Sequence, residues 1–348
     1  MSGKKREEAM YDMIVVGGGP AGMTAALYAL RNGKQVLVIE KSGFGGQITH
    51  SPKVENYPGT LQMSGNEFAD QMLDQILAQG AEIEFEAVVS VETAASAAVE
   101  TAEAAAETTA AKNRKTFIVR TEEGGAYEGR TVILATGVKH RMLGLEGENE
   151  LVGEGISFCA VCDGDFYSGQ TVCVAGGGNS ALQEAILLAQ KCKEVIMLQD
   201  LPYFTGEEKL QEVLFAYPHV RAYTGVKITG FAKNGEALCG VEIEKAANPA
   251  NAADPAETTE AAGTAEKQVI PCDGLFVAIG LIPENEAFAE LAALNTYGYF
   301  DSDERCLTKT PGIYVAGDCR SKEIRQLTTA AADGAVAALA ACRYLNAG

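Results

Sequence analysis

The fold of this chain is decided by the stretch Met13-Ile14-Val15-Val16-Gly17-Gly18-Gly19-Pro20-Ala21-Gly22. Four apolar residues run directly into glycines, which is typical of a buried parallel strand that ends in a tight turn. Residues 21–32 follow with helical spacing, and residues 35–39 form a second apolar run that is closed by Glu40. Strand, glycine turn, helix, strand and acid in this order predict a βαβ unit that binds a dinucleotide.

Individual residues of this unit have separate physical tasks. Gly17 permits the tight turn, Gly19 lets the backbone approach a pyrophosphate, and Gly22 lets helix and strand pack closely. The helix presents its N-terminus to the phosphates, and Glu40 can accept hydrogen bonds from both hydroxyls of an adenosine ribose. A glycine pattern alone is a weak signal, but the strands and the terminal acid around it make the prediction specific.

The same pattern occurs a second time. Residues 171–174 are an apolar run, Gly176-Gly177-Gly178 follow, residues 180–190 have helical spacing, and residues 195–198 form another apolar run. The sequence therefore predicts an α/β protein with two dinucleotide-binding, Rossmann-like domains of the FAD/NAD(P) type.

The C-terminal part has a strand and a helix of the same kind as those of the first domain. Residues 312–318 read as a strand that ends at Gly-Asp, and residues 330–345 as an alanine-rich helix. We therefore expect a discontinuous first domain, residues 1–145 and 273–348, with the second domain, residues 146–272, inserted into it. Two segments rich in Ala, Thr and Glu, residues 93–111 and 246–265, are flanked by strand-like runs, and we expect them to form exposed hairpin tips.

Composition excludes several classes of protein. The formal net charge of −19 argues against binding to nucleic acid, because phosphate contacts need a basic surface. No apolar run reaches the ~18 residues that span a bilayer, and the N-terminus does not read as a signal peptide, so we expect a cytoplasmic protein. Nine cysteines, an odd number, fit a reducing compartment, and with one CxxC and three histidines we expect no metal site.

The stretch Cys159-Ala160-Val161-Cys162-Asp163 lies between the two glycine turns. Such cysteines can close a small disulfide or open to a dithiol, and the acid beside them can move the proton that thiolate chemistry requires. Half of a metal site or an inert core pair are the alternative interpretations of an isolated CxxC. Together with two dinucleotide-type folds, the motif predicts a flavoenzyme that reduces or oxidises disulfides.

The chain resembles the low-molecular-weight thioredoxin reductases, which are FAD-containing homodimers. The resemblance covers nearly the whole sequence except the two Ala/Thr/Glu-rich segments. The matching stretches are residues 17–22, Gly45-Gly46-Gln47, residues 55–59, 135–137, 159–164 and 278–280, Gly317-Asp318 and Arg325-Gln326. The FAD-contacting residues that the resemblance implies are Gly17, Gly19, Pro20, Ala21, Gly22, Glu40, Lys41, Gly46, Gln47, Asn56, Val88, Ala135, Thr136, Gly137, Gly317, Asp318, Arg325 and Gln326.

The resemblance also implies catalytic roles. Cys162 is the sulfur that faces the flavin, Cys159 attacks the disulfide of thioredoxin, and Asp163 supplies or removes the proton. It implies thioredoxin as the partner protein and a homodimer as the assembly.

One site departs from the family. NADPH-dependent members carry His-Arg-Arg-x-x-x-Arg after the second strand of the second domain, where cations hold the 2′-phosphate. This chain has Gln199-Asp200-Leu201-Pro202-Tyr203-Phe204-Thr205 at that place, so all three arginines are missing.

Several interpretations of this departure stay open. The stretch Leu198-Gln199-Asp200-Leu201 resembles that of the ferredoxin-dependent flavin thioredoxin reductases, and by this resemblance we expect reduced ferredoxin as the electron donor. Alternatively, Asp200 binds the 2′-hydroxyl of NADH, or NADPH is still used. A further alternative is a flavin-bearing redox sensor without turnover.

Overall fold

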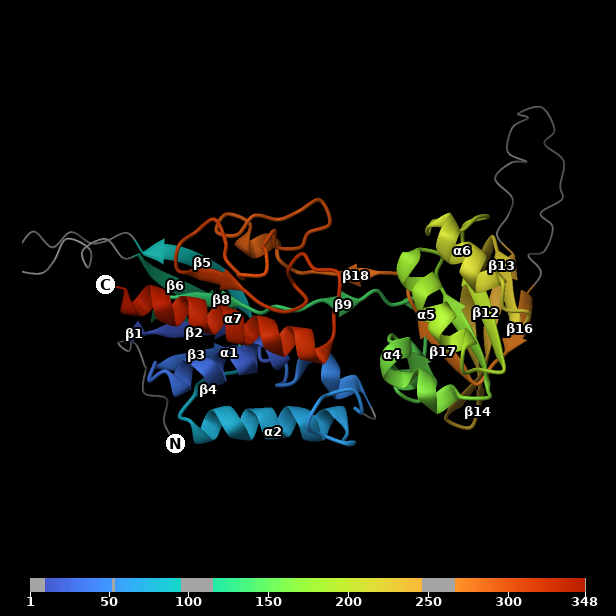
Figure 1. Ribbon diagram of the computed structural model, residues 1–348, viewed down its shortest axis with the longest axis horizontal. Helices are drawn as coiled ribbons and strands as arrows, with labels where there is room; N and C mark the ends of the chain where they lie inside the picture. The colour runs from blue at the N-terminus through green and yellow to red at the C-terminus, as the bar shows by residue number, and fades with distance from the viewer. Residues whose placement is uncertain (1–9, 52–53, 95–114, 246–266, 348) are drawn as a thin grey trace, which may run out of the picture. The chain divides into compact units, whose positions relative to one another are not determined.

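The computed structural model describes residues 10–51, 54–94, 115–245 and 267–347. The chain divides into two compact units, one formed by Met1–Lys139 with Ile282–Gly348 and the other by His140–Leu281. Each unit is built on a five-stranded parallel sheet (Figure 1), which confirms the predicted α/β class with two Rossmann-like folds. Most of the two predicted hairpin tips, residues 95–111 and 246–265, lies outside the described residues.

The parallel sheet of the first unit contains the predicted βαβ unit. Its strand order is β19 (Ile313–Val315), β8 (Val132–Leu134), β2 (Met13–Val16), β3 (Val36–Ile39) and β4 (Glu82–Glu84). The helices of this unit are α1 (Pro20–Arg31), α2 (Gly65–Ala78) and α7 (Leu327–Asn346). The glycine turn therefore lies at the carboxyl end of a central strand.

Both faces of this sheet are buried, which explains the uninterrupted apolar runs of its strands. Met13 and Val15 of β2 pack with alanines of α1 and α7 in one hydrophobic cluster. Ile14 and Val16 point to the other face and pack in a second cluster, which contains Phe117.

Helices α1 and α7 lie side by side on the sheet (Figure 1). A Cβ atom at Gly334 of α7 would overlap with the carbonyl oxygen of Ala21 in α1. Glycine at this position thus permits the close approach of the two helices. Helix α2 begins at a capping box, in which the Ser64 hydroxyl accepts from the Glu67 N–H at 3.1 Å and the Ser64 N–H donates to the Glu67 carboxylate at 2.8 Å.

A second sheet covers the Phe117 side of the first unit. Its order is β1 (Met10–Tyr11), β7 (Ala126–Gly129), β6 (Thr116–Thr121) and β5 (Val88–Ala94). The short 3-10 helices of this unit are η1 (Gly46–His50) and η5 (Glu286–Phe288). Where the chain passes between the units, β9 (Lys139–His140) and β18 (Leu281–Ile282) form a two-stranded sheet.

The second unit repeats the arrangement of the first. Its parallel sheet has the order β10 (Ile156–Ser157), β17 (Gly274–Val277), β11 (Thr171–Ala175), β12 (Glu194–Gln199) and β13 (Val220–Thr224). Val172 and Val174 pack in one cluster with α5 (Asn179–Ala189), and Cys173 and Ala175 pack in another on the opposite face. The register is thus that of a sheet covered on both sides.

An antiparallel sheet covers this opposite face, formed by β14 (Val226–Asn234), β15 (Ala237–Lys245) and β16 (Lys267–Pro271). The remaining helical segments of the second unit are α3 (Glu148–Leu151), α4 (Ala160–Asp163), η3 (Gly164–Tyr167) and α6 (Glu208–Phe215). Within the part of the chain that the structure describes, none of the helices has the length and apolar character that a bilayer crossing demands.

Candidate functional site

The glycine turn of the first unit is packed too tightly for any side chain at two positions. A Cβ atom at Gly17 would overlap with the carbonyl oxygen of Ala135, and one at Gly22 would overlap with that of Gly17. A Cβ atom at Gly19, by contrast, would have its nearest neighbour at 3.9 Å, the carbonyl oxygen of Gly45. The turn therefore leaves open the side on which a pyrophosphate approaches the N-terminus of α1.

Glu40 fastens the end of β3 to this turn. One carboxylate oxygen accepts from the backbone N–H of Gly18 at 2.6 Å, and the other accepts from the N–H of Ser42 at 2.9 Å. The predicted ribose acceptor is thus held by hydrogen bonds at the carboxyl end of β3 and is buried.

Other predicted FAD residues reach the same edge of the sheet from neighbouring strands. Residues 135–137 follow β8, and Gly317 and Asp318 follow β19. Because β19, β8, β2 and β3 are adjacent and parallel, their carboxyl ends lie along one edge. The N–H of Gly45 donates to the carbonyl of Gly18 at 2.9 Å and so brings Gly46 and Gln47 to the glycine turn.

Asp318 has an unusual environment. Its Oδ1 atom is buried and has no hydrogen-bond partner among the described residues. Burial raises the pKa of this carboxyl, although the cations of Lys322 and Arg325 act in the opposite direction. A buried oxygen without a partner at the sheet edge fits a hydroxyl of a bound ligand, such as the ribityl chain of FAD.

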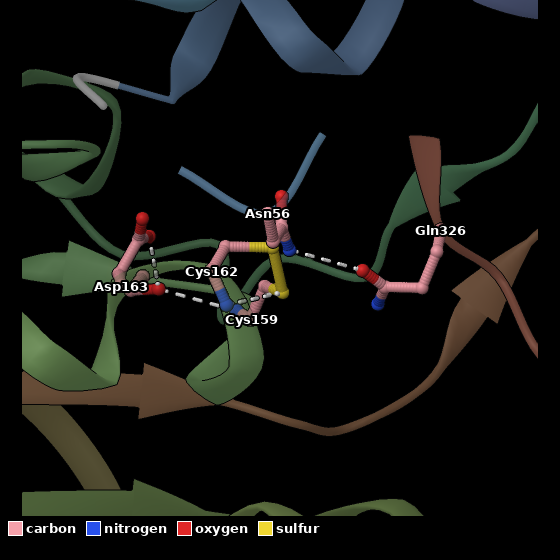
Figure 2. The surroundings of a disulfide bond; sticks show 6 residues. Asn56, Cys159, Cys162, Asp163 and Gln326 are labelled. Atoms are coloured by element: carbon pink, nitrogen blue, oxygen red, sulfur yellow. Dashed lines mark hydrogen bonds between the residues drawn. A yellow bond between two sulfur atoms is a disulfide. The ribbon is translucent and has the colours of Figure 1, made fainter. Parts of the chain in front are cut away.

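The remaining predicted FAD residues lie at several other places in the first unit. Asn56 donates to the side-chain oxygen of Gln326 at 3.4 Å (Figure 2), and the Arg325 guanidinium lies 4.3 Å from the centre of the Tyr299 ring. Lys41 instead forms an exposed ion pair with Glu284 at 2.7 Å, and Val88 lies in β5, where it packs against the Phe117 cluster.

The sulfur site lies in the second unit. Cys159 and Cys162 form a disulfide across the short helix α4 (Figure 2), and Cys159 is the N-cap of that helix. The Sγ atom of Cys159 accepts from the N–H of Cys162 at 3.2 Å. The tight helical turn therefore holds the two sulfurs together and directs an N–H at Cys159, the sulfur that the resemblance makes the attacking one.

Ser157 connects Asp163 to this turn and was not found from the sequence. Its hydroxyl accepts from the N–H of Cys159 at 3.1 Å and donates to the Oδ2 atom of Asp163 at 2.7 Å. The serine lies at the end of β10, two residues before the CxxC motif, and this proximity in sequence was the available signal. The structure thus places Asp163 one hydroxyl away from the backbone of Cys159.

Burial raises the pKa values of two acids near the disulfide. It raises the pKa of Asp163, and the hydrogen bond from Ser157 acts against this rise. It also raises the pKa of Glu184 in α5 to about 8, against the effect of a hydrogen bond from the backbone of Ala160 and with a contribution from the charge of Asp163. A carboxyl group that holds its proton near neutral pH is suited to proton transfer. Glu184 lies three residues after Ala181 and four before Leu188, both buried in α5, so the helical period was the signal that places it on the buried face.

The second glycine turn retains its backbone form. A Cβ atom at Gly177 would lie 2.5 Å from the side chain of Gln199, which is buried at the end of β12. The N–H groups of Thr205 and Gly206 donate to the carbonyl of Gly177 at 2.8 and 2.9 Å. The loop after β12 is therefore held against the glycine turn.

The loop that follows β12, residues 200–207, contains neither arginine nor lysine. Asp200 is exposed, and its carboxylate accepts from the N–H of Leu201 at 2.9 Å. Arg221 pairs with Glu194 at the start of β12, the opposite end of the strand from Gln199. The position where a 2′-phosphate would need cations is therefore acidic and apolar.

Comparisons with known proteins agree with this fold and site. The family described as pyridine nucleotide-disulphide oxidoreductase matches residues 11–334. The chain is 34% identical over 340 residues to a thioredoxin reductase of Listeria monocytogenes, covering 98% of this chain and 95% of that protein. It is also 34% identical to a 34.2 kDa protein in the rubredoxin operon of Clostridium pasteurianum, covering 98% and 99%.

Solved structures show the same relationship. The crystal structure of thioredoxin reductase from Streptococcus pyogenes has a TM-score of 0.83 and 33% identity, covering 98% of this chain and 99% of that chain. This chain belongs to the low-molecular-weight thioredoxin reductase family within the pyridine nucleotide-disulphide oxidoreductases.

Proposed function

We propose that this protein is a FAD-dependent thioredoxin reductase that takes its electrons from reduced ferredoxin. The Cys159–Cys162 pair passes them to the disulfide of thioredoxin. The observation that carries the choice of donor is the contrast between two sites in one unit. The disulfide still has Asp163 beside it, whereas the loop after β12 has none of the three arginines that hold a 2′-phosphate in NADPH-dependent members.

Electrostatics supports this choice. A carboxylate held about 5 Å from a dianionic phosphate raises the free energy of the complex by roughly 7 kcal/mol at an effective dielectric near 20. The side chain that replaces the first family arginine is the exposed carboxylate of Asp200. Thr205 replaces the third, and its hydroxyl donates to the carbonyl of Gly177 at 3.3 Å. Neither side chain compensates a phosphate dianion.

The redox potentials allow this direction of transfer. A plant-type ferredoxin near about −400 mV and a thioredoxin near about −270 mV differ by an amount that releases about 6 kcal/mol for two electrons.

Each unit contributes its own residues to the reaction. The glycine turn, Glu40 and Asp318 would hold FAD, which when bound accepts electrons and delivers them to a disulfide. After reduction, Cys159 attacks the disulfide of thioredoxin as a thiolate, because thiolates are the nucleophiles in this exchange. Asp163 takes the proton of Cys159, and Ser157 orients Asp163 toward the CxxC turn.

NADH is the second candidate donor. Asp200 lies exposed directly after β12, where acids of dinucleotide-binding folds accept hydrogen bonds from the 2′-hydroxyl of a ribose. This alternative makes a distinct prediction, because a 2′-hydroxyl tolerates a carboxylate and a 2′-phosphate does not.

Anaerobic stopped-flow spectroscopy separates the donors. Purified protein is mixed with reduced ferredoxin, NADH or NADPH, and bleaching of the flavin band is recorded. We expect rapid bleaching with reduced ferredoxin and slow or no bleaching with NADH or NADPH. Rapid bleaching by NADPH at micromolar concentration contradicts the proposal, and rapid bleaching by NADH selects the second candidate.

A variant with arginines at the three family positions serves as the matched gain-of-function control. Asp200→Arg, Leu201→Arg and Thr205→Arg together restore the missing cations. We expect this variant to be reduced by NADPH at least about tenfold faster than the parent protein.

A further inference from the structure

Glu184 faces the redox site from a helix other than the one that carries Asp163. It lies in α5, which packs against α4. The backbone N–H of Ala160, the residue after Cys159, hydrogen-bonds to its carboxyl group. Its Oε2 atom is buried and has no hydrogen-bond partner among the described residues.

Asp163, like Glu184, has one carboxylate oxygen that is buried without a hydrogen-bond partner among the described residues. Its Oδ2 atom accepts from Ser157, but its Oδ1 atom is buried and has no partner within the described part of the chain. The two carboxyl groups interact electrostatically, since the charge of Asp163 raises the pKa of Glu184. Two half-buried acids that repel each other as anions favour a state in which the pair keeps a proton.

No other charged group described in the structure perturbs Glu184 in this way. Asp163 is the one ionisable side chain that contributes to its raised pKa. Tyr167, in the 3-10 turn that follows, is affected by the charge of Asp163, but burial raises the pKa of Tyr167 to about 12, so it stays neutral. The two acids can therefore be treated as one unit.

We propose that Asp163 and Glu184 form a carboxyl pair that holds one proton for the exchange between Cys159 and the disulfide of thioredoxin. This inference rests on the proposed function, because thioredoxin is the substrate of the step. Asp163 is the member that exchanges the proton with the sulfurs. Glu184 acts through Asp163 and is a positioning residue.

The step balances without any further reactant. The S–H bond of Cys159 breaks, its sulfur bonds to one sulfur of thioredoxin, and the S–S bond of thioredoxin breaks. The leaving sulfur of thioredoxin takes the proton of the pair, and the proton of Cys159 refills the pair. The pair is thus unchanged after each exchange, and it already holds a proton for the leaving sulfur when the attack begins, whereas a single carboxylate of ordinary pKa is deprotonated at neutral pH until it has taken the proton of Cys159.

Infrared difference spectroscopy on the oxidised holoenzyme tests the pair directly. We expect the carbonyl stretch of a protonated carboxyl group to titrate near pH 8 and to vanish in Glu184→Gln. In Asp163→Asn the midpoint moves to lower pH, because the neighbouring negative charge is lost. Glu208→Gln, an exposed acid of α6, is the matched control and keeps the titration unchanged. A midpoint that Asp163→Asn does not move overturns the pair.

The pH dependence of thioredoxin reduction gives the second readout. Dithionite-reduced enzyme is mixed anaerobically with oxidised thioredoxin at a series of pH values. In Glu184→Gln we expect the rate of thioredoxin reduction to begin its fall with rising pH at least about one pH unit lower than in the parent protein. At slightly alkaline pH the variant should be about tenfold slower. An unchanged profile in Glu184→Gln overturns the inference while the function stands. Failure of the parent enzyme to reduce thioredoxin at any pH instead overturns the proposed function, and the infrared titration still decides the pair.

Discussion

Asp333 of α7 accepts two hydrogen bonds from the guanidinium of Arg320, from Nε to Oδ2 and from Nη2 to Oδ1, both at 2.8 Å. Oδ2 also accepts from the ammonium of Lys322 at 2.9 Å and from the N–H of Gly317 at 3.1 Å. Although burial raises the pKa of Asp333, its bonds to Arg320 and Lys322 hold the net pKa below the usual value. This carboxylate therefore fixes the Gly317-Asp318 turn at the sheet edge.

Removing this carboxylate is expected to destabilise the first unit strongly. Asp333→Ala leaves Arg320, whose side chain is 3% exposed, without its buried partner, which costs about 3–5 kcal/mol of unfolding free energy. Urea unfolding at neutral pH measures the loss. Asp303→Ala breaks the exposed ion pair with Arg305 and should leave the midpoint unchanged. Equal midpoints for the two variants would contradict the role of Asp333.

Substitution of Asp318 is expected to weaken flavin binding more than folding. Asp318→Ala removes the buried Oδ1 atom that has no protein partner in the described chain, so folding loses little while a hydroxyl of FAD loses its acceptor. We expect an increase of about tenfold or more in the dissociation constant for FAD, since hydrogen bonds to charged groups contribute about 1.5–3 kcal/mol. Fluorescence titration of apoprotein with FAD measures it.

The exposed Asp301→Ala is the control for flavin binding and should bind like the parent protein. Unchanged FAD affinity in Asp318→Ala would remove Asp318 from the cofactor site.

The attacking sulfur can be separated from its partner by substitution. Cys159→Ser should abolish thioredoxin reduction, with a rate at least about a thousandfold lower, while FAD stays bound, because a hydroxyl does not supply the thiolate nucleophile. Visible absorbance checks the flavin, and insulin precipitation by thioredoxin checks turnover. Cys192→Ser, a buried cysteine outside the motif, is the control. Turnover that survives in Cys159→Ser would exclude the catalytic assignment. Absence of turnover in the parent protein with every donor favours the redox sensor.

Stability should depend on pH through Glu184. Its pKa rises from 4.5 to about 8 on folding, so the folded protein binds the proton more tightly than the unfolded chain. The stabilisation is complete below the unfolded value and is lost as the pH rises through the folded value. Chemical unfolding of the parent protein and of Glu184→Gln at several pH values tests this. We expect the variant to lose less stability than the parent between weakly acidic and weakly alkaline pH, and parallel pH curves would contradict the raised pKa.

Close packing of α1 against α7 predicts a steric effect. Gly334→Ala forces a methyl group onto the carbonyl of Ala21 and should cost about 1–3 kcal/mol. Val336→Ala, on the more exposed side of the same helix, should change stability by less than about 1 kcal/mol. Thermal unfolding of both variants measures the difference. A Gly334→Ala variant as stable as the parent would show that the helices can separate without loss.

Much of the fold could be predicted because its signals are local. The runs at residues 13–16 and 171–174 become β2 and β11, and the helical stretches after each glycine turn become α1 and α5. Apolar periodicity and glycine turns depend on a few consecutive residues, so one sequence suffices to find them. The CxxC motif was visible for the same reason, and the disulfide across α4 agrees with it.

The sequence alone determined the two βαβ units, the CxxC turn with its acid and the absence of arginines after the second strand of the second unit. Only the tertiary structure decided which carboxyl groups are buried and what they face: Glu184 beside the Asp163 turn, Asp333 around Arg320, and Glu40 on the N–H of Gly18. Arg320 and Asp333 are 13 residues apart in the sequence, and Gly18 and Glu40 are 22 residues apart. The physical reason is that desolvation depends on how distant segments pack, which no local pattern encodes.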